Sequence, residues 1–289
     1  MSEKSAPVRY SRSNQLGGQT GPVLSGPPPS SQPVPKAVLK AADGDLITPV
    51  WRNELGGVTF QLGIGPVRRF VKWSPVDGID LRIEARKLLW AADYVAVPRV
   101  LRIGSDEVGG ALVTAGLPGQ NAVTDHWLSD PATAVAAIGA GLRELHDTAP
   151  VDRCPFSWSI ADRLANINGR AAVIDPTRWH DDHRHLTLNQ ALARLADPPP
   201  IDRLVVCHGD ACAPNTLLAD DGTCSGRVDL GALGVADRWA DLAIATWSAH
   251  WNYGGNYGAD WESALLDAYG IHPDPERTAY YRLLWELGP

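Results

Sequence analysis

The chain has 289 residues, 44% hydrophobic and 20% charged, which is typical of a globular protein with a large core. Its net charge of −7 argues against nucleic acid as a partner, and no apolar run approaches the roughly 18 residues of a membrane helix. Because the N-terminus lacks the apolar core of a signal peptide, we expect a cytoplasmic protein without a membrane partner. The four cysteines form no CxxC pair, which argues against a zinc site or a disulfide framework.

Residues 1–36 are rich in Ser, Pro, Gly and Gln and contain few large apolar side chains. Such a segment buries too little apolar surface to offset the entropy of ordering, so we predict a disordered or polyproline-like tail. A proline-rich docking role for this tail stays open.

Residues 37–115 read as mostly strands with one helix, and we predict a small N-terminal lobe there. Gly56 and Gly57 stand between a Trp-containing stretch and a β-rich run. This pattern indicates a hairpin turn whose backbone can come close to a ligand.

Lys72 lies in the β-rich run Val67–Trp73, and the next helix is expected from about Asp77 to Ala92. On that helix Glu84 shares a face with apolar residues three positions before it and four after it, so its carboxylate points inward and requires a partner. The spacing predicts a pair between Lys72 and Glu84; a surface salt bridge is the alternative.

After a further strand at 111–115, the sequence Gly116-Leu-Pro-Gly119 breaks the β pattern, and helical spacing follows from Asp130. We place a hinge here and a mainly helical lobe over residues 116–289, in which we interpret Trp179–His185 as a solvated loop. In a nucleotide-binding protein the backbone around Thr114 and Gly116 would contact adenine.

The stretch from Val205 to Asp241 carries the most specific pattern. An apolar run ends in His208-Gly-Asp210, and an Asp-Gly turn between two short apolar arms predicts a hairpin. The hairpin would bring Asn215, at the start of the first arm, close to Asp229, at the end of the second. Phosphoryl transfer needs a base and oxygen ligands for Mg²⁺ close together. We predict that Asp210 is the base and that Asn215 and Asp229 are the Mg²⁺ ligands.

The segments His208–Cys212, Pro214-Asn215 and Gly234–Arg238 resemble the aminoglycoside phosphotransferases, closest to the kanamycin-kinase type, and the likeness runs from about Trp51 to the C-terminus. The resemblance implies an α+β, protein-kinase-like bilobal fold with ATP and Mg²⁺ between the lobes. It implies further that Gly56 and Gly57 cover ATP and that Lys72 and Glu84 hold its α- and β-phosphates.

The C-terminal part departs from that family. Glu286 stands where the family has its second C-terminal acid, but Trp285 replaces the first, and Trp251 stands where an acidic substrate contact is usual. We assign Trp247, Trp251, Trp285, Glu286 and Asp237 to acceptor binding. Core packing is the alternative for the tryptophans, because Trp247 and Trp251 are four residues apart.

These patterns predict an ATP-dependent phosphotransferase acting on a small molecule, with the 3′-hydroxyl of an aminoglycoside antibiotic as the expected acceptor. A different small acceptor, such as an amino sugar or another antibiotic, is the first alternative. A catalytically inactive nucleotide-binding module is the second.

Overall fold

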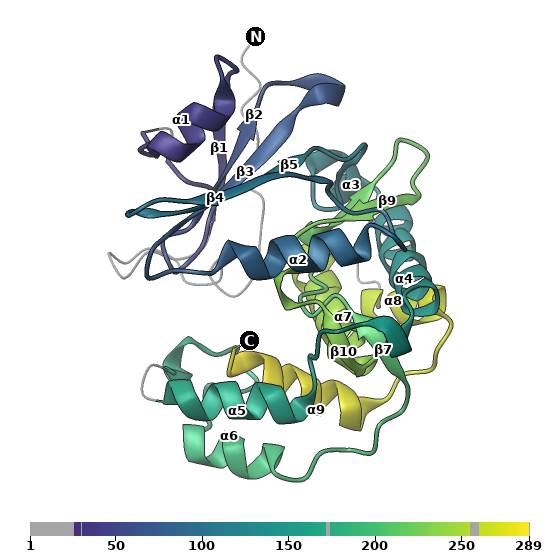
Figure 1. Cartoon of the computed structure of the whole chain (residues 1–289). Coiled ribbons are helices and arrows are strands. Elements are labelled where there is room, and N and C mark those ends of the chain that lie inside the picture. The colour runs from purple at the N-terminus through teal and green to yellow at the C-terminus, as the bar shows by residue number, and fades with distance from the viewer. Residues whose placement is uncertain (1–25, 30, 172–173, 255–259, 289) are drawn as a thin grey trace.

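The computed structural model describes residues 26–29, 31–171, 174–254 and 260–288, which form two lobes (Figure 1). The N-terminal lobe is built on an antiparallel sheet in the order β1-β2-β3-β5-β4. Its strands are β1 (Ile47–Arg52), β2 (Val58–Leu62), β3 (Arg69–Pro75), β4 (Val100–Ser105) and β5 (Gly109–Ala115), with the short 3₁₀ turn η1 (Gly65–Val67) before β3.

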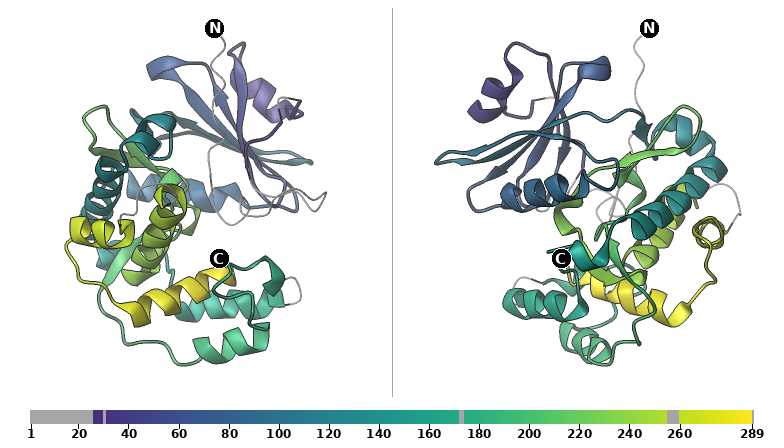
Figure 2. Two further views of the ribbon diagram at one scale, coloured as in Figure 1. Left: turned by 180° about the vertical axis from the view of Figure 1, so that it is seen from behind. Right: turned by 45° about the vertical axis from the view of Figure 1, so that its right-hand side comes forward.

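Helix α2 (Leu81–Ala91) lies beneath this sheet, on the side facing the C-terminal lobe (Figure 2). Asp80 caps it by accepting a hydrogen bond from the N–H of Arg82. Its buried positions include 81, 84, 85, 88 and 91, which is the spacing of one helical face. The helix expected from 77 to 92 is therefore present, with a later start.

A second helix in this lobe, α1 (Lys36–Ala42), was not expected from the sequence. It is only seven residues long, has no side-chain cap, and follows a proline-rich stretch, so no strong helix signal marks it. It nonetheless buries Val38 in one apolar cluster with Phe60 and Val71 of the sheet. Residues 1–25 of the tail expected over 1–36 lie outside the described part of the chain. Its last part is not disordered: Gly26 exchanges two 2.9 Å backbone hydrogen bonds with Arg52, and Val34 packs against the same apolar cluster.

The C-terminal lobe is larger and mainly helical, as expected. Its helices are α3 (Asp125–Ser129), α4 (Pro131–Thr148), α5 (Ile160–Arg170), α6 (Leu188–Leu195), α7 (Trp239–Tyr253), α8 (Trp261–Tyr269) and α9 (Pro275–Glu286). Its short strands are β6 (Gln120–Asn121), β7 (Leu204–Cys207), β8 (Thr216–Leu218), β9 (Cys224–Arg227) and β10 (Gly234–Asp237). Its 3₁₀ turns are η2 (Val151–Arg153), η4 (Pro176–Arg178), η5 (Ala213–Asn215) and η6 (Leu230–Ala232).

Two short antiparallel pairs in this lobe position the residues of interest. β8 pairs with β9, with Thr216 opposite Arg227, and β7 pairs with β10, with Cys207 opposite Gly234. The predicted hairpin is thus confirmed. An apolar cluster joins α2 to Val206, Leu230 and Leu233, so the N-terminal lobe packs directly on these strands and their loops.

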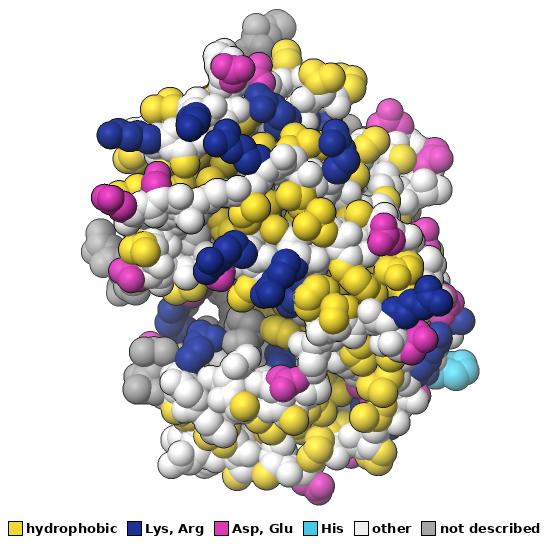
Figure 3. Space-filling view, viewed as in Figure 1, with side chains coloured by type: hydrophobic (Ala, Val, Ile, Leu, Met, Phe, Trp, Pro, Cys, Tyr) yellow, Lys and Arg dark blue, Asp and Glu magenta, His cyan; other side chains and the backbone are white. Residues whose placement is uncertain are grey.

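The space-filling view shows a hollow between the two lobes at one edge of the molecule, with Lys and Arg side chains beside it (Figure 3). No helix among the described residues is both long and apolar enough to cross a membrane.

Candidate active site

The loop after β7 presents Asp210. Gly209 has a φ of +84°, and a Cβ there would lie 2.3 Å from the carbonyl oxygen of Ala232, so this sharp approach requires glycine. Asp210 Oδ2 accepts a hydrogen bond from Asn215 Nδ2 at 3.2 Å. The thiol of Cys212 also acts on this carboxylate and lowers its pKa. The other oxygen, Oδ1, is buried and has no hydrogen-bond partner at normal geometry among the described residues. One oxygen of Asp210 is therefore oriented by the protein and the other is left for a ligand.

Burial of Asp210, together with the negative charge of Asp229, raises the pKa of its carboxyl group above the ordinary value. A carboxylate with a raised pKa is a better proton acceptor than an exposed one, which suits a general base.

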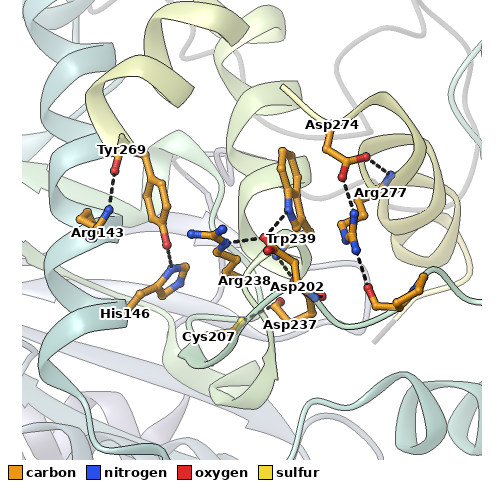
Figure 4. Close-up of polar contacts among 11 residues, drawn as sticks. Arg143, His146, Asp202, Cys207, Asp237, Arg238, Trp239, Tyr269, Asp274 and Arg277 are labelled. Atoms are coloured by element: carbon orange, nitrogen blue, oxygen red, sulfur yellow. Dashed lines mark hydrogen bonds and ion pairs between the residues drawn. The ribbon is translucent and has the colours of Figure 1, made fainter. Parts of the chain in front are cut away.

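Asp241, near the start of α7, holds the loop in place. Its carboxylate accepts hydrogen bonds from the N–H groups of His208 at 2.6 Å and Gly209 at 2.8 Å, and from His146 Nε2 at 3.0 Å. His146 is held in turn by the hydroxyl of Tyr269, 2.9 Å from Nδ1 (Figure 4). Burial lowers the pKa of His146, so the ring is neutral and donates from Nε2.

Asp229 lies at the end of the hairpin, as the sequence predicts. The N–H of Val228 donates to the carbonyl of Asn215 at 3.0 Å, which places Asn215 and Asp229 side by side. Asp229 has a φ of +64°, a left-handed conformation that is uncommon for a residue with a side chain. Such conformations concentrate at functional sites.

Lys72 connects the two lobes. Its Nζ atom lies 2.7 Å from Glu84 Oε1 and 2.7 Å from Asp229 Oδ1, so the expected pair with Glu84 is present and is extended by Asp229. Burial alone would lower the pKa of Lys72, but the carboxylates of Asp229 and Glu84 raise it above the ordinary value. The ammonium group is therefore charged at any physiological pH.

Gly56 and Gly57 form the turn between β1 and β2. Gly56 has a φ of +79°, and Asn53 Oδ1 accepts the N–H of Gly57 at 2.8 Å, which fixes the turn. Glu54 at its tip forms a 3.0 Å ion pair with Arg178 of the C-terminal lobe. This contact between the lobes was not foreseen from the sequence.

Thr114 and Gly116 lie where β5 ends and the chain crosses between lobes. Thr114 is buried and stands in the sheet opposite both Phe70 and Val100. The N–H of Gly116 donates to the carbonyl of Arg68 at 2.8 Å. That N–H is therefore already used within the protein, so an adenine contact at this residue would come from its carbonyl.

The three tryptophans assigned to the acceptor come together. Their ring centroids are 4.7 Å apart for Trp247 and Trp251, 6.1 Å for Trp247 and Trp285, and 6.0 Å for Trp251 and Trp285. Trp247 is 2% exposed and packs with Cys212, two residues from Asp210, whereas Trp251 and Trp285 are partly buried. Trp247 thus belongs to the core, and the other two form the rim of a cluster next to the Asp210 loop.

Glu286 is buried behind this rim. Its Oε1 atom accepts the N–H of His180 at 2.9 Å and lies 3.4 Å from His183 Nδ1. The ring of His180 packs on Trp247 at 4.8 Å, and Trp179 is only 5% exposed. The interpretation of this segment as a solvated loop is therefore wrong for Trp179, His180 and His183, whereas its other residues are exposed. Contacts of His180 and His183 with Glu286, more than 100 positions away, leave no local sequence signal.

Asp237 does not join the group. It lies at the far end of β10, opposite Leu204, while Asp210 follows the other end of β7. Its two oxygens accept the N–H groups of Asp202 and Trp239, and it is 4% exposed (Figure 4). Its carboxylate caps backbone within the lobe, so we do not retain it as an acceptor contact.

Two groups of side chains offer metal ligands. Asp229 and Asn215 supply a carboxylate and an amide oxygen at the cleft, and the Asp229 side chain is 48% exposed; these hard oxygen donors fit Mg²⁺. Among the described residues, His146, Cys207 and Asp241 also lie together, but they are buried. His146 and Asp241 already hold the loop described above, and the thiol of Cys207 donates to the carbonyl of Asp237. We interpret that second group as structural.

Comparisons with known proteins agree with this geometry. A family model described as "Phosphotransferase enzyme family" matches residues 59–281. An aminoglycoside 3′-phosphotransferase of Streptomyces fradiae is 35% identical over 250 residues, covering 81% of this chain and 92% of the relative. A streptomycin 3″-kinase of Streptomyces griseus is 34% identical over 269 residues, covering 87% and 96%.

Among solved structures, an aminoglycoside-3′-phosphotransferase of type VIII has a TM-score of 0.74 at 32% identity, covering 84% of this chain and 94% of the other. APH(3″)-Id from Streptomyces rimosus, solved in complex with ADP and streptomycin, has a TM-score of 0.70 at 29% identity, covering 86% and 95%. The protein-kinase-like bilobal fold and the resemblance to the aminoglycoside phosphotransferases are both confirmed. With Lys72, Asp210, Asn215 and Asp229 gathered at the cleft between its lobes, the chain belongs to the phosphotransferase enzyme family.

Proposed function

We propose that this protein transfers the γ-phosphoryl group of ATP to a hydroxyl group of an aminoglycoside, with the 3′-hydroxyl as the expected position. The main support is the cluster of polar side chains at the cleft. Lys72 Nζ lies 2.7 Å from both Glu84 and Asp229, and Asp210 has one buried oxygen that a ligand could use. Relatives of 34–36% identity that act on aminoglycosides support the acceptor class.

ATP would lie between the lobes. The turn at Gly56 and Gly57 would cover the phosphates, and Lys72, oriented by Glu84, would contact the α- and β-phosphates. Adenine would lie beside Thr114 and Gly116. Since the N–H of Gly116 already donates to Arg68, its carbonyl is the group that would accept a hydrogen bond from the adenine amino group.

Asn215, through its amide oxygen, and Asp229 would hold Mg²⁺, which when bound supplies positive charge next to the phosphate oxygens. The amide nitrogen of Asn215 donates to both the carbonyl and the side chain of Asp210, at 2.9 and 3.2 Å, and this fixes the amide with its oxygen on the other side. The same residue thereby orients the base and offers a ligand atom.

Asp210 would accept the proton of the acceptor hydroxyl through Oδ1. The hydroxyl oxygen then forms its bond to the γ-phosphorus, the bond from that phosphorus to the β,γ-bridging oxygen breaks, and ADP leaves.

The acceptor would lie over the rim formed by Trp251 and Trp285, with Glu286 behind it. Aromatic faces bind the C–H faces of sugars and attract cations, so this rim suits a cationic sugar. The same rim supports a second candidate, a small acceptor other than the kanamycin-type compounds, because tryptophan stands at two positions where an acid is usual in the resembled family.

The test is the release of ADP from Mg·ATP in the presence of kanamycin, neomycin, streptomycin, an aminoglycoside lacking the 3′-hydroxyl, and simple amino sugars. Release with kanamycin but not with the deoxy compound is the expected result. Release only with streptomycin would move the reaction to another hydroxyl, and release only with amino sugars would support the second candidate. ATP turnover with none of them would contradict the aminoglycoside assignment, and nucleotide binding without any turnover would indicate an inactive binding module.

A further inference from the structure

A buried lysine on α2 takes no part in the chemistry proposed above. Lys87 is 7% exposed, and its Nζ atom donates a hydrogen bond to the carbonyl oxygen of Gly231 at 2.7 Å. Gly231 belongs to η6 of the other lobe, two residues after Asp229. Burial lowers the pKa of Lys87 to about 8, so keeping a lysine here has a cost that an apolar side chain would avoid.

Lys87 is the middle one of three attachments that join one face of α2 to the C-terminal lobe. Glu84 holds Lys72, which reaches Asp229, and Trp90 Nε1 donates to the carbonyl of Arg153 at 3.2 Å. Glu84, Lys87 and Trp90 follow one another at intervals of three, so they lie along one side of the helix. Two of these attachments, through Lys72 to Asp229 and from Lys87 to Gly231, lead to the loop that carries Asp229, and the third leads to η2.

That loop needs support from outside. Asp229 has a φ of +64°, and a non-glycine residue in this region persists only where its surroundings hold it there. Leu230 and Leu233, on either side of Gly231, pack against α2 through their side chains. The space that a Cβ of Gly231 would occupy is open, and the hydrogen bond from Lys87 is a polar contact that holds the carbonyl of this glycine itself.

We propose that Lys87 is a positioning residue for phosphoryl transfer: by holding the carbonyl of Gly231 it fixes the loop of Asp229 relative to the Glu84–Lys72 pair. The expected effect on catalysis rests on the proposed phosphotransferase function. Whether Lys87 holds the loop can be measured in the free protein, without substrate.

The variant Lys87→Met keeps most of the side-chain length and removes the donor, Lys87→Arg keeps a charged donor, and Arg86→Met removes an exposed cation from the neighbouring position as a control. Steady-state kinetics, thermal melting and amide hydrogen exchange over residues 228–234 would be measured for all three in the full-length protein. We expect Lys87→Met to lower kcat roughly 10- to 100-fold, the size expected for loss of a hydrogen bond from a charged group.

In the same variant the KM for ATP should change little, exchange over 228–234 should become faster in the ligand-free protein, and Lys87→Arg should reverse much of both effects. Arg86→Met should behave as wild type. An unchanged kcat and unchanged exchange in Lys87→Met would overturn the proposal. So would a general loss of thermal stability with no local change in exchange, because that result describes a merely structural lysine. If the wild type phosphorylates no acceptor, the proposed function fails, while the exchange data still decide whether Lys87 holds the loop.

Discussion

Asp210 divides its two carboxylate oxygens between two roles. Oδ2 accepts a hydrogen bond from Asn215, and Oδ1 is buried without a hydrogen-bond partner in the described part of the chain. A buried oxygen left in this state costs free energy unless a ligand completes it. The residue is thus prepared for one incoming donor, which is what a base for a hydroxyl requires.

Replacing Asp210 by alanine should lower turnover about 10²- to 10⁴-fold, the usual contribution of a general base, with little change in nucleotide binding. The measurement is kcat with the preferred acceptor together with ADP affinity by calorimetry. Asp220→Ala, on the exposed turn between β8 and β9, is the matched control and should remain fully active. Persistent turnover in Asp210→Ala would mean that another group accepts the proton.

Trp285 tests whether the aromatic rim selects the acceptor. Trp285→Asp restores an acid at the position where the resembled family carries one, and a charge-assisted hydrogen bond contributes about 1.5–3 kcal/mol. We expect kanamycin affinity to rise, as measured by calorimetry with the folded variant. Trp285→Phe, which keeps an apolar ring, is the control and should leave the affinity close to that of the wild type. Equal affinity in all three proteins would show that this position does not govern acceptor choice.

At the scale of elements, the loop of Asp210 depends on contacts from α4 and α7. His146 on α4 donates to Asp241 on α7, and Asp241 accepts the N–H groups of His208 and Gly209. A loop held by two hydrogen bonds to one buried carboxylate, which His146 fixes in turn, keeps its shape before any substrate arrives. The position of Asp210, the proposed base, is therefore set by the helices behind its loop.

The same contact predicts a pH dependence of stability. Burial lowers the pKa of His146 below its ordinary value of 6.5, although Asp241 acts in the opposite direction and Arg227 and Arg203 add to the lowering. The unfolded chain therefore binds a proton that the folded protein does not, so stability is complete above about pH 6.5 and falls as the pH drops below it. Thermal melts between pH 5 and 8 should show this slope in wild type and a smaller one in His146→Gln. Parallel curves for the two proteins would contradict the assignment.

The features predicted correctly at this scale depend on residues close together in the sequence. The hairpin that joins Asn215 to Asp229 follows from an Asp-Gly turn within 15 residues, and the pairing of Lys72 with Glu84 follows from the facing side of one helix. Helix α1 was missed because it is short and uncapped. Asp237 was wrongly assigned to the acceptor site because the sequence does not show which end of β10 lies next to Asp210. In the structure Asp237 stands at the opposite end, across from Leu204.

Contacts between segments far apart in the sequence could not be predicted from local patterns. Lys87 meets Gly231 across 144 positions, and Arg178 meets Glu54 from the other lobe. A lysine on a helix and an arginine in a polar loop are common surface features, so their partners follow only from the packing of the two lobes. The acceptor rim is intermediate: the sequence assigned Trp247, Trp251, Trp285 and Glu286 to it, and the structure adds His180 and His183.

At the scale of the whole molecule, the two lobes are joined both inside the cleft and at its mouth. Lys72 and Lys87 connect them inside, and Glu54 meets Arg178 at the tip of the turn that would cover the nucleotide. The ion pair at the mouth joins partly exposed side chains and contributes little by itself. The internal contacts therefore dominate the relative position of the lobes.

A ligand that binds between the lobes should stabilise the folded protein as a whole. At an ADP concentration of 100 times its dissociation constant, linkage gives about 2.7 kcal/mol, which raises the melting temperature by several degrees. Differential scanning fluorimetry with Mg·ADP measures this shift. In Lys72→Met the shift at the same concentration should be much smaller, and an unchanged shift would argue against contact between Lys72 and the phosphates.

The bridge from Lys72 to Asp229 bears on the order in which ligands arrive. The ammonium of Lys72 lies 2.7 Å from the carboxylate of Asp229, which would face a divalent ion, and it lowers the pKa of that carboxyl group. A second cation must compete with this one, whereas an anionic nucleotide draws the ammonium toward itself and frees the carboxylate. Lys72 would thus neutralise Asp229 until a nucleotide binds and Mg²⁺ takes its place. Titration with Mg²⁺ should give clearly tighter binding after ADP has been added than before.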